Sequence, residues 1–262
     1  MISTSQKTLA AVILTRNAEH QIEPCLKSVS GWAEEIIIVD GGSTDKTIDL
    51  CKPYTQKIFI RPFKGSFSDD RNFGANQTTT DWILQLDADE VVPQSFKEKF
   101  ELIRNNPQFS AYKTRRKNFF LGHCMDKGPW YHYIQILYQK NKAQFHGLVH
   151  ERLAVQGNMG ILEAEIEHTP FHCISEWVER HNRYTSLAAQ ELYETHGTLP
   201  WKTIRRHLFY KSFKMFWKLF IMKRAYRDGI YGFIFSVLYA FEHFLKWVKY
   251  WELVKDKINN EA

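Results

Sequence analysis

Short hydrophobic runs alternate with amphipathic segments through the first hundred residues. The runs predict strands near residues 9–15, 34–40, 56–63 and 81–87. The segments between and after them predict helices near residues 18–30, 43–54, 68–79 and 93–106. Strands that are almost continuously hydrophobic and are separated by helices indicate a mostly parallel sheet with helices on both faces.

The pattern changes after about residue 109. Longer strands are expected near residues 111–122, 133–141 and 161–169, and a long helix near 175–197. The fold class expected is therefore α/β, with a Rossmann-like, mostly parallel sheet followed by a helical extension. We divide the chain into an α/β domain, residues 1–172, and a C-terminal helical region, residues 173–262.

Composition agrees with a folded protein in a reducing compartment. Of 262 residues, 44% are hydrophobic and 24% are charged, so the chain can bury a core. The four cysteines are far apart in sequence, which argues against a disulfide framework or a zinc site and suggests the cytoplasm. The first hydrophobic run ends at Arg16 and is expected to be a strand, not a signal peptide.

The positive charge lies in the C-terminal segment. Residues 201–262 contain 13 Lys and Arg against 5 Asp and Glu, whereas the rest of the chain contains 22 against 24. The same segment holds 17 of the 39 aromatic residues. Two regions with different partners are therefore expected.

The basic segment has the pattern of an amphipathic helix. Helical spacing predicts one aromatic stripe, with cations displaced from it, made of Phe209, Phe213, Phe216, Trp217 and Phe220. This favours an anionic membrane surface as partner, because no run reaches the ~20 apolar residues that a bilayer span requires. A helix packed on the catalytic domain and a nucleic-acid surface are the alternatives, and we rank nucleic acid lowest.

Polar residues follow three of the expected strands. They are Thr15, Arg16 and Asn17 after the first, Asp40 before Gly41 and Gly42 after the second, and Asp87, Ala88, Asp89 and Glu90 after the fourth. Ligands of open α/β sheets bind beyond the carboxyl ends of the strands. These residues are therefore expected to line one crevice.

Asp87 and Asp89 are two residues apart, so both point the same way from an extended segment. Carboxylates aimed at one place repel each other unless a cation lies between them, and magnesium or manganese prefers oxygen ligands. The alternative is that Asp89 caps the next helix and Asp87 is solvated. We predict a divalent cation held by Asp87 and Asp89, with His150 as a further ligand.

Four motifs together carry a family resemblance: VILTRNAE, EIIIVDGGSTDKT, FSDDRNFGAN and DWILQLDADE. They resemble the family 2 glycosyltransferases, which have a GT-A fold. The resemblance implies a nucleotide pocket lined by Thr15, Arg16, Asn17 and Ala88. It further implies that Asp40 reads the base and Arg71 contacts base or pyrophosphate. Asp87 and Asp89 would hold the metal on the sugar nucleotide.

Motifs in the second half extend the resemblance. FHGLVHERL, RHNRYTSLAAQE, AYRDGIYGF and FLKWVKYWE resemble lipopolysaccharide-core β-glucosyltransferases of the WaaE/KdtX type. Inverting transfer needs one general base for the acceptor hydroxyl. Glu151 is our candidate, Asp126 and Glu90 are competing candidates, and a surface ion pair between Glu151 and Arg152 is the structural alternative.

The expected protein is a metal-dependent hexosyltransferase, peripheral on the cytoplasmic face of the cell membrane. It would move glucose from UDP-glucose to a heptose of a lipid-anchored core oligosaccharide, with no nucleic-acid partner. Another polysaccharide or lipid-linked acceptor is the alternative within the class. A membrane-surface binding protein that keeps the fold without activity is the alternative outside it.

Overall fold

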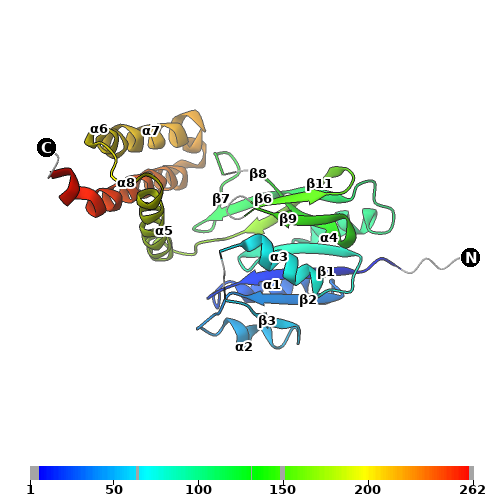
Figure 1. Cartoon of the computed structure of the whole chain (residues 1–262). Coiled ribbons are helices and arrows are strands. Elements are labelled where there is room, and N and C mark those ends of the chain that lie inside the picture. The colour runs from blue at the N-terminus through cyan, green and yellow to red at the C-terminus, as the bar shows by residue number, and fades with distance from the viewer. Residues whose placement is uncertain (1–5, 63–64, 131, 148–150, 260–262) are drawn as a thin grey trace, which may run out of the picture. The chain divides into compact units, whose positions relative to one another are not determined.

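The computed structural model describes residues 6–62, 65–130, 132–147 and 151–259, and the side chains to residue 255 (Figure 1). The chain forms two compact units. Unit 1 comprises residues up to Lys117 together with His132–His168, and unit 2 comprises Asn118–Tyr131 and the residues from Thr169 onward.

Most strands belong to unit 1. The parallel strands of this unit are β1 (Leu9–Thr15), β2 (Glu35–Asp40), β3 (Ile58–Ile60) and β4 (Trp82–Asp87). The remaining strands are β5 (Glu90–Val91), β6 (Ala111–Phe120), β7 (His123–Cys124), β8 (His132–Gln139), β9 (Ala143–His146), β10 (Arg152–Val155) and β11 (Met159–His168).

Within the described residues the principal sheet has nine strands, in the order β3-β2-β1-β4-β8-β6-β11-β5, with β7 paired to β6. The strands from β3 to β4 are parallel, and β8 pairs antiparallel with both β4 and β6. β9 and β10 form a separate antiparallel pair. The sheet is thus mixed, and its parallel strands, β1 to β4, come from the N-terminal part of the chain.

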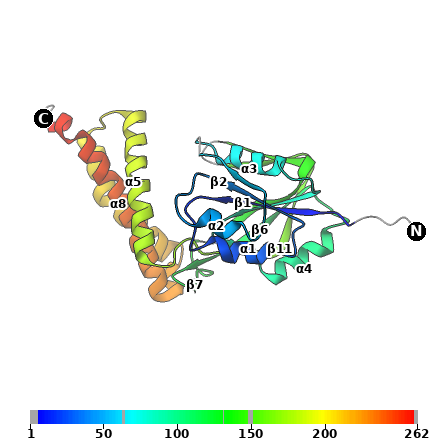
Figure 2. The ribbon, with the colours of Figure 1, turned by 90° about the horizontal axis from the view of Figure 1, so that it is seen from below.

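Helices cover both faces of the parallel strands (Figure 2). The helices of unit 1 are α1 (Ile22–Val29), α2 (Thr47–Cys51), α3 (Phe67–Asn76) and α4 (Gln94–Ile103). Side chains alternate along β1, so Ala11 and Ile13 pack in a core with α1 and α4. Ala10 and Val12 point to the opposite core, which includes Ala75 of α3. Each face of β1 therefore has its own hydrophobic core.

Gly74 brings α3 close to the sheet. A Cβ at Gly74 would lie 2.4 Å from Val12 Cγ1 and 2.9 Å from Val39 Cγ2. Gly74→Ala should therefore lower the free energy of unfolding by about 1–3 kcal/mol, because overpacking outweighs the better helix propensity of Ala. The urea midpoint measures the loss. Asn76→Ala on the exposed side of the same helix is the control, and equal stability of both variants would contradict this packing.

Unit 2 is mainly helical and has two cores of its own, one around Phe120, Trp177 and Phe235 and one around Trp247 and Tyr250. Its helical elements are α5 (Ile174–His196), α6 (Trp201–Arg205), the π-helical η2 (Arg206–Lys211), α7 (Ser212–Trp217), the π-helical η3 (Lys218–Met222), the 3-10 turn η4 (Ala225–Asp228) and α8 (Gly229–Asn259). In the described part of the chain, none of the helices has the length and apolar content needed to cross a bilayer.

The predicted aromatic stripe of the basic segment is wrong for two of its members. Phe216 and Phe220 do not face outward with the others, because their rings pack on Phe233 of α8 at centroid distances of 5.9 and 5.8 Å. Phe209, Phe213 and Trp217 are exposed. The stripe therefore divides between helix packing and the surface.

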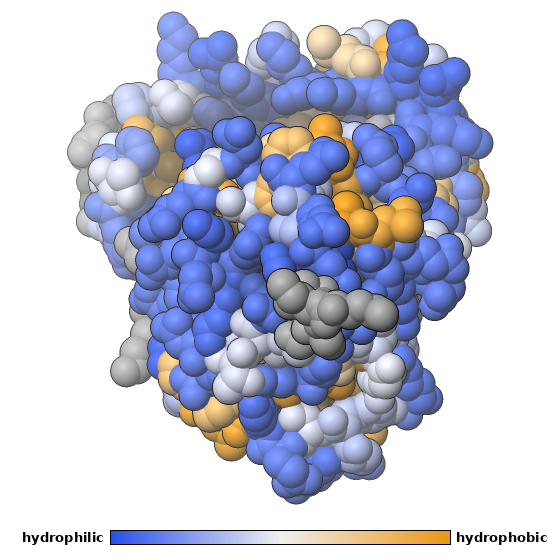
Figure 3. Space-filling model, turned by 90° about the vertical axis from the view of Figure 1, so that its right-hand side faces the viewer, coloured by the Kyte–Doolittle hydropathy of each residue, from blue (hydrophilic) through white to orange (hydrophobic). Residues whose placement is uncertain are grey.

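On the face of the molecule drawn in Figure 3, hydrophilic residues predominate and hydrophobic residues form separate small patches. Such scattered apolar exposure is ordinary for a protein surface in water.

Candidate active site

The three polar strand ends lie at one edge of the sheet. Thr15 of β1 is opposite Asp40 of β2, and Leu14 is opposite Asp87 of β4. The parallel strands end together because their hydrophobic runs are paired in register. The edge therefore gathers residues that are far apart in sequence.

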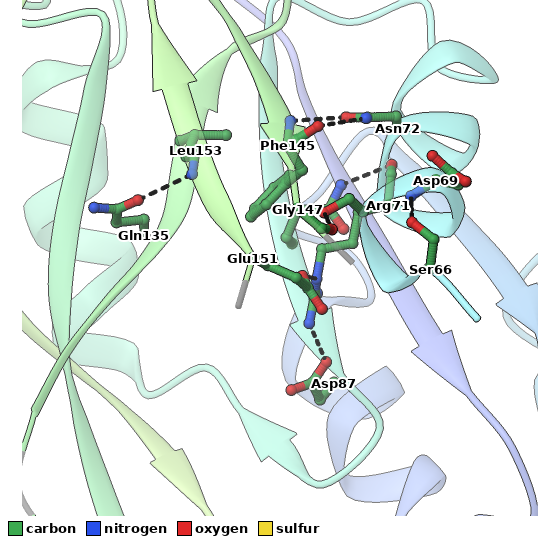
Figure 4. Close-up of polar contacts among 12 residues, drawn as sticks. Ser66, Asp69, Arg71, Asn72, Asp87, Gln135, Phe145, Gly147, Glu151 and Leu153 are labelled. Carbon is green, nitrogen blue, oxygen red and sulfur yellow. Dashed lines mark hydrogen bonds and ion pairs between the residues drawn. The ribbon is translucent and has the colours of Figure 1, made fainter. Parts of the chain in front are cut away.

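Arg71 links two of the acidic residues (Figure 4). Its Nε donates to Glu151 Oε2 at 2.6 Å, and its Nη2 donates to Asp87 Oδ1 at 2.8 Å. Only 13% of the Arg71 side chain is exposed, and Gln85 Nε2 donates to its carbonyl at 3.1 Å. A guanidinium has donors in a rigid fork, so one side chain fixes both carboxylates.

Arg116 of β6 forms the second bridge. Its Nη2 lies 2.5 Å from Glu90 Oε1 and 3.4 Å from Asp87 Oδ2. Glu90 is buried, and its Oε2 accepts from the Asp87 backbone N–H at 2.9 Å. The turn after β4 is thus held by ionic and backbone contacts from Arg116 and Glu90.

Asp89 has a carboxylate oxygen that no described residue satisfies. Its Oδ1 is buried and has no hydrogen-bond partner in the described part of the chain. Its Oδ2 lies 3.6 Å from His168 Nε2 at the end of β11. An unsatisfied buried carboxylate oxygen is costly, so this atom suits a cation or a donor from a ligand.

Burial and ion pairs set the protonation of this cluster. Burial alone would raise the pKa of Asp87, but Arg71 and Arg116 outweigh it and lower that pKa to about 2. Burial raises the pKa of Glu90, and the charge of Asp87 adds to this effect while Arg116 opposes it. Burial disfavours the charged guanidinium of Arg71, yet Asp87 and Glu151 raise its pKa above the ordinary value. Asp87 therefore stays anionic.

The loops after β1 and β2 are joined by hydrogen bonds. Asp40 is fully buried, and its Oδ1 accepts from Gly42 N at 2.9 Å and from Ser43 N at 2.7 Å. Its Oδ2 accepts from Ser43 Oγ at 2.5 Å. Asn17 N donates to the same Oγ at 2.8 Å. Asp40 thus holds the loop that follows β2.

Thr15 and Ala88 are buried, whereas Arg16 and Asn17 are exposed at the strand edge. Thr15 Oγ1 is buried with no hydrogen-bond partner among the residues that the structure covers.

His150 lies outside the described residues. Asp126 is exposed and belongs to unit 2. Arg71, Asp87 and Glu151 are therefore the predicted residues that the structure brings into direct contact, with Asp89 in the same turn as Asp87.

The sequence-model comparison decides the family. The model of Glycosyl transferase family 2 matches residues 10–150, more than half of the chain. The chain belongs to glycosyl transferase family 2. Together with the observed mixed sheet and helical C-terminal region, this confirms the GT-A type fold expected for the glycosyltransferase.

Relatives cover nearly the whole glycosyltransferase. An uncharacterised glycosyltransferase of Rickettsia typhi is 27% identical over 94% of this chain and 88% of its own. The lipopolysaccharide core biosynthesis glycosyltransferase LpsC of Rhizobium meliloti is 25% identical over 93% of this chain and 92% of its own. The crystal structure of S. aureus TarS 1–349 with UDP-GlcNAc is 15% identical over 95% of this chain and 92% of that one, with a TM-score of 0.46.

The candidate site of the glycosyltransferase contains two residues that the sequence pattern did not single out, Arg116 and His168. A signal for Arg116 was present, since it alternates with Thr114 and Asn118, which are both buried. Two short polar residues at inward positions mark a polar interior for that face of β6. His168 had no comparable signal, because its place beside Asp89 depends on the pairing of β11 with β5.

Proposed function

We propose that this glycosyltransferase is an inverting, metal-dependent enzyme that transfers a hexose, glucose from UDP-glucose, to a heptose of a lipid-anchored lipopolysaccharide core. The bridge of Arg71 between Asp87 and Glu151 carries the proposal. Arg71 contacts both Glu151, the candidate base, and Asp87, a residue of the candidate donor site. The likeness to LpsC supports the acceptor class.

Two observations support a divalent cation. The cluster contains four carboxylates, Asp87, Asp89, Glu90 and Glu151, against the two guanidinium groups of Arg71 and Arg116. Asp89 also has the unsatisfied oxygen described above. Within the described ranges no three His, Cys, Asp or Glu side chains already converge as a metal site, and Asp87 is turned to the arginines. Asp87 and Asp89 have the hard oxygen ligands that magnesium or manganese prefers.

The residues of this chain divide the reaction between them. Glu151 takes the proton from the acceptor hydroxyl as that oxygen attacks the anomeric carbon from the side opposite the leaving diphosphate. Arg71 holds the Glu151 carboxylate in place through the 2.6 Å contact. A cation on the diphosphate would stabilise the charge that develops when the sugar–phosphate bond breaks. Thr15, Arg16, Asn17, Arg71 and Ala88 would line the nucleotide pocket.

Base recognition by Asp40 remains a prediction. Its carboxylate already accepts three hydrogen bonds from its own loop. Each carboxylate oxygen has two acceptor sites, so contact with a nucleotide requires that Asp40 keep the loop bonds and accept one more. We propose that the reaction takes place at the cytoplasmic face of the membrane, where a nucleotide sugar can meet a lipid-anchored acceptor.

Release of UDP tests the proposal. The purified protein with manganese should release UDP from UDP-glucose rapidly when a heptose-containing core glycolipid is present. Release should be slow with the same glycolipid lacking heptose, and with UDP-GlcNAc or UDP-galactose as donor. Fast transfer to a different glycan would replace the acceptor assignment. Nucleotide-sugar binding with no transfer or hydrolysis would favour the non-catalytic alternative.

A further inference from the structure

Helix α8 carries a continuous exposed apolar stripe. Its members recur at intervals of three and four residues and therefore share one side of the helix. They are Ile230, Phe233, Val237, Phe241, Phe244 and Trp251, with the half-buried Val248 between the last two. Ile230 is 62% exposed and Phe241 46% exposed, whereas Phe235, Trp247 and Tyr250 on the other side are buried. The helix is thus apolar on both its packed side and its solvent side.

A second stripe lies on the preceding helical segment. Phe209, Phe213, Trp217 and Ile221 follow at intervals of four residues, and Phe209 and Phe213 are 68% and 67% exposed. The segment that carries this stripe also packs on α8, because Phe216 and Phe220 contact the ring of Phe233. We call the exposed members of both stripes the aromatic face of unit 2. Scattered single apolar residues are ordinary on a surface, but a face of this extent marks an interaction site.

The charge beside the aromatic face is of one sign. Residues 201–227 contain nine Lys and Arg and no Asp or Glu. Eight of these cations are exposed: Lys202, Arg205, Arg206, Lys214, Lys218, Lys223, Arg224 and Arg227. An apolar face with cations along it is complementary to an anionic lipid surface.

A second copy of the chain fits this face less well. The spacing on α8 would suit helix pairing, but a symmetric dimer brings the same patch of both copies together. Two segments of nine cations each would then meet, and like charges repel. An anionic leaflet instead satisfies the charge and the apolar side chains together.

We infer that the aromatic face of unit 2 inserts into the interfacial layer of an anionic leaflet, with the neighbouring Lys and Arg side chains on lipid phosphates. The helices would lie in the plane of the interface, since none of the described helices can span the bilayer. The inference rests on the proposed function only for its purpose, which is to bring the enzyme to a lipid-anchored acceptor.

Vesicle flotation tests this surface with the full chain. Wild-type protein should float with phosphatidylcholine vesicles that contain phosphatidylglycerol, and at least about 10-fold less with pure phosphatidylcholine. High salt should weaken the binding without abolishing it, because salt does not screen the apolar part. Failure to float at low salt would overturn the inference.

Two variants separate the apolar and ionic parts. Phe213→Ser with Phe241→Ser changes one exposed residue in each stripe and should reduce binding at least about 10-fold, leaving a remainder that high salt removes. Lys214→Gln with Lys218→Gln should reduce binding mainly at low salt. Leu102→Ser with Lys99→Gln, both exposed on α4 of unit 1, is the matched control and should bind as wild type.

Other outcomes assign the face elsewhere. If Phe213→Ser with Phe241→Ser floated as well as wild type, the aromatic face would not be the lipid contact. If sedimentation showed a wild-type dimer that this variant dissolves, the face would be a self-association surface. Hydrolysis of free UDP-glucose should be equal in all variants. If the wild-type protein floated with anionic vesicles but had no transferase activity, the proposed function would be refuted and the lipid-binding role of the aromatic face would stand.

Discussion

Replacing Glu151 with Gln is expected to lower turnover about 100-fold or more while leaving donor affinity nearly unchanged. The amide keeps the size of the side chain but cannot take a proton from the acceptor. Arg71 keeps its contact with Asp87, so the donor side of the cluster is preserved. Transfer rates at saturating acceptor, together with calorimetry of UDP binding in the presence of manganese, measure the two quantities separately.

Glu163→Gln is the matched control, because Glu163 is exposed on β11 of the same unit and undergoes the same chemical change. It should leave turnover unchanged. Asp126→Asn tests the competing base in unit 2, and a large loss of turnover there with full activity in Glu151→Gln would reverse the assignment. If Glu151→Gln lost donor binding and turnover equally, Glu151 would belong to the donor site or to the framework. Glu90 is the weaker competitor, because it is buried and engaged by Arg116 and the Asp87 N–H.

The parallel part of the fold was predictable because its signals are local. Runs such as Leu9–Thr15 and Trp82–Asp87 are hydrophobic on both faces, and the polar residue that ends each run marks the sheet edge. The insertion of β8 between β4 and β6 was not predictable. It depends on pairing between strands about fifty residues apart along the chain, which no local pattern specifies.

In the candidate site, single residues could be predicted from the sequence, but contacts between distant segments could not. Asp87 and Arg71 could be singled out from their motifs, but their contact depends on how α3 sits on the sheet at Gly74. The aromatic stripe failed at Phe216 and Phe220 because helical spacing defines a side of a helix without telling whether another helix covers it. The stripe on α8 was missed because its solvent side is as apolar as its packed side, which leaves no amphipathic contrast to detect.

The second large effect is expected for Asp89→Ala, which should weaken manganese-dependent UDP binding at least about 100-fold, or ~2.7 kcal/mol. The melting temperature of Asp89→Ala should equal or exceed that of the wild-type protein. The lost Oδ1 has no hydrogen-bond partner among the described residues, and one fewer carboxylate in the cluster means less repulsion. A binding defect in a protein of unchanged or higher melting temperature would separate ligand contact from a folding defect.

Calorimetry of UDP with manganese and with a chelator, alongside thermal melts, measures both sides of this prediction. In wild-type protein the chelator should remove most of the UDP affinity, whereas in Asp89→Ala it should change little, because the metal-dependent part is already lost. Asp69→Ala removes an exposed carboxylate from α3 and should bind UDP as wild type does. Unchanged UDP affinity with manganese in Asp89→Ala would refute the metal assignment. Asp89 would then be the partner of His168, 3.6 Å away, and its role would be to hold the turn after β4 against β11.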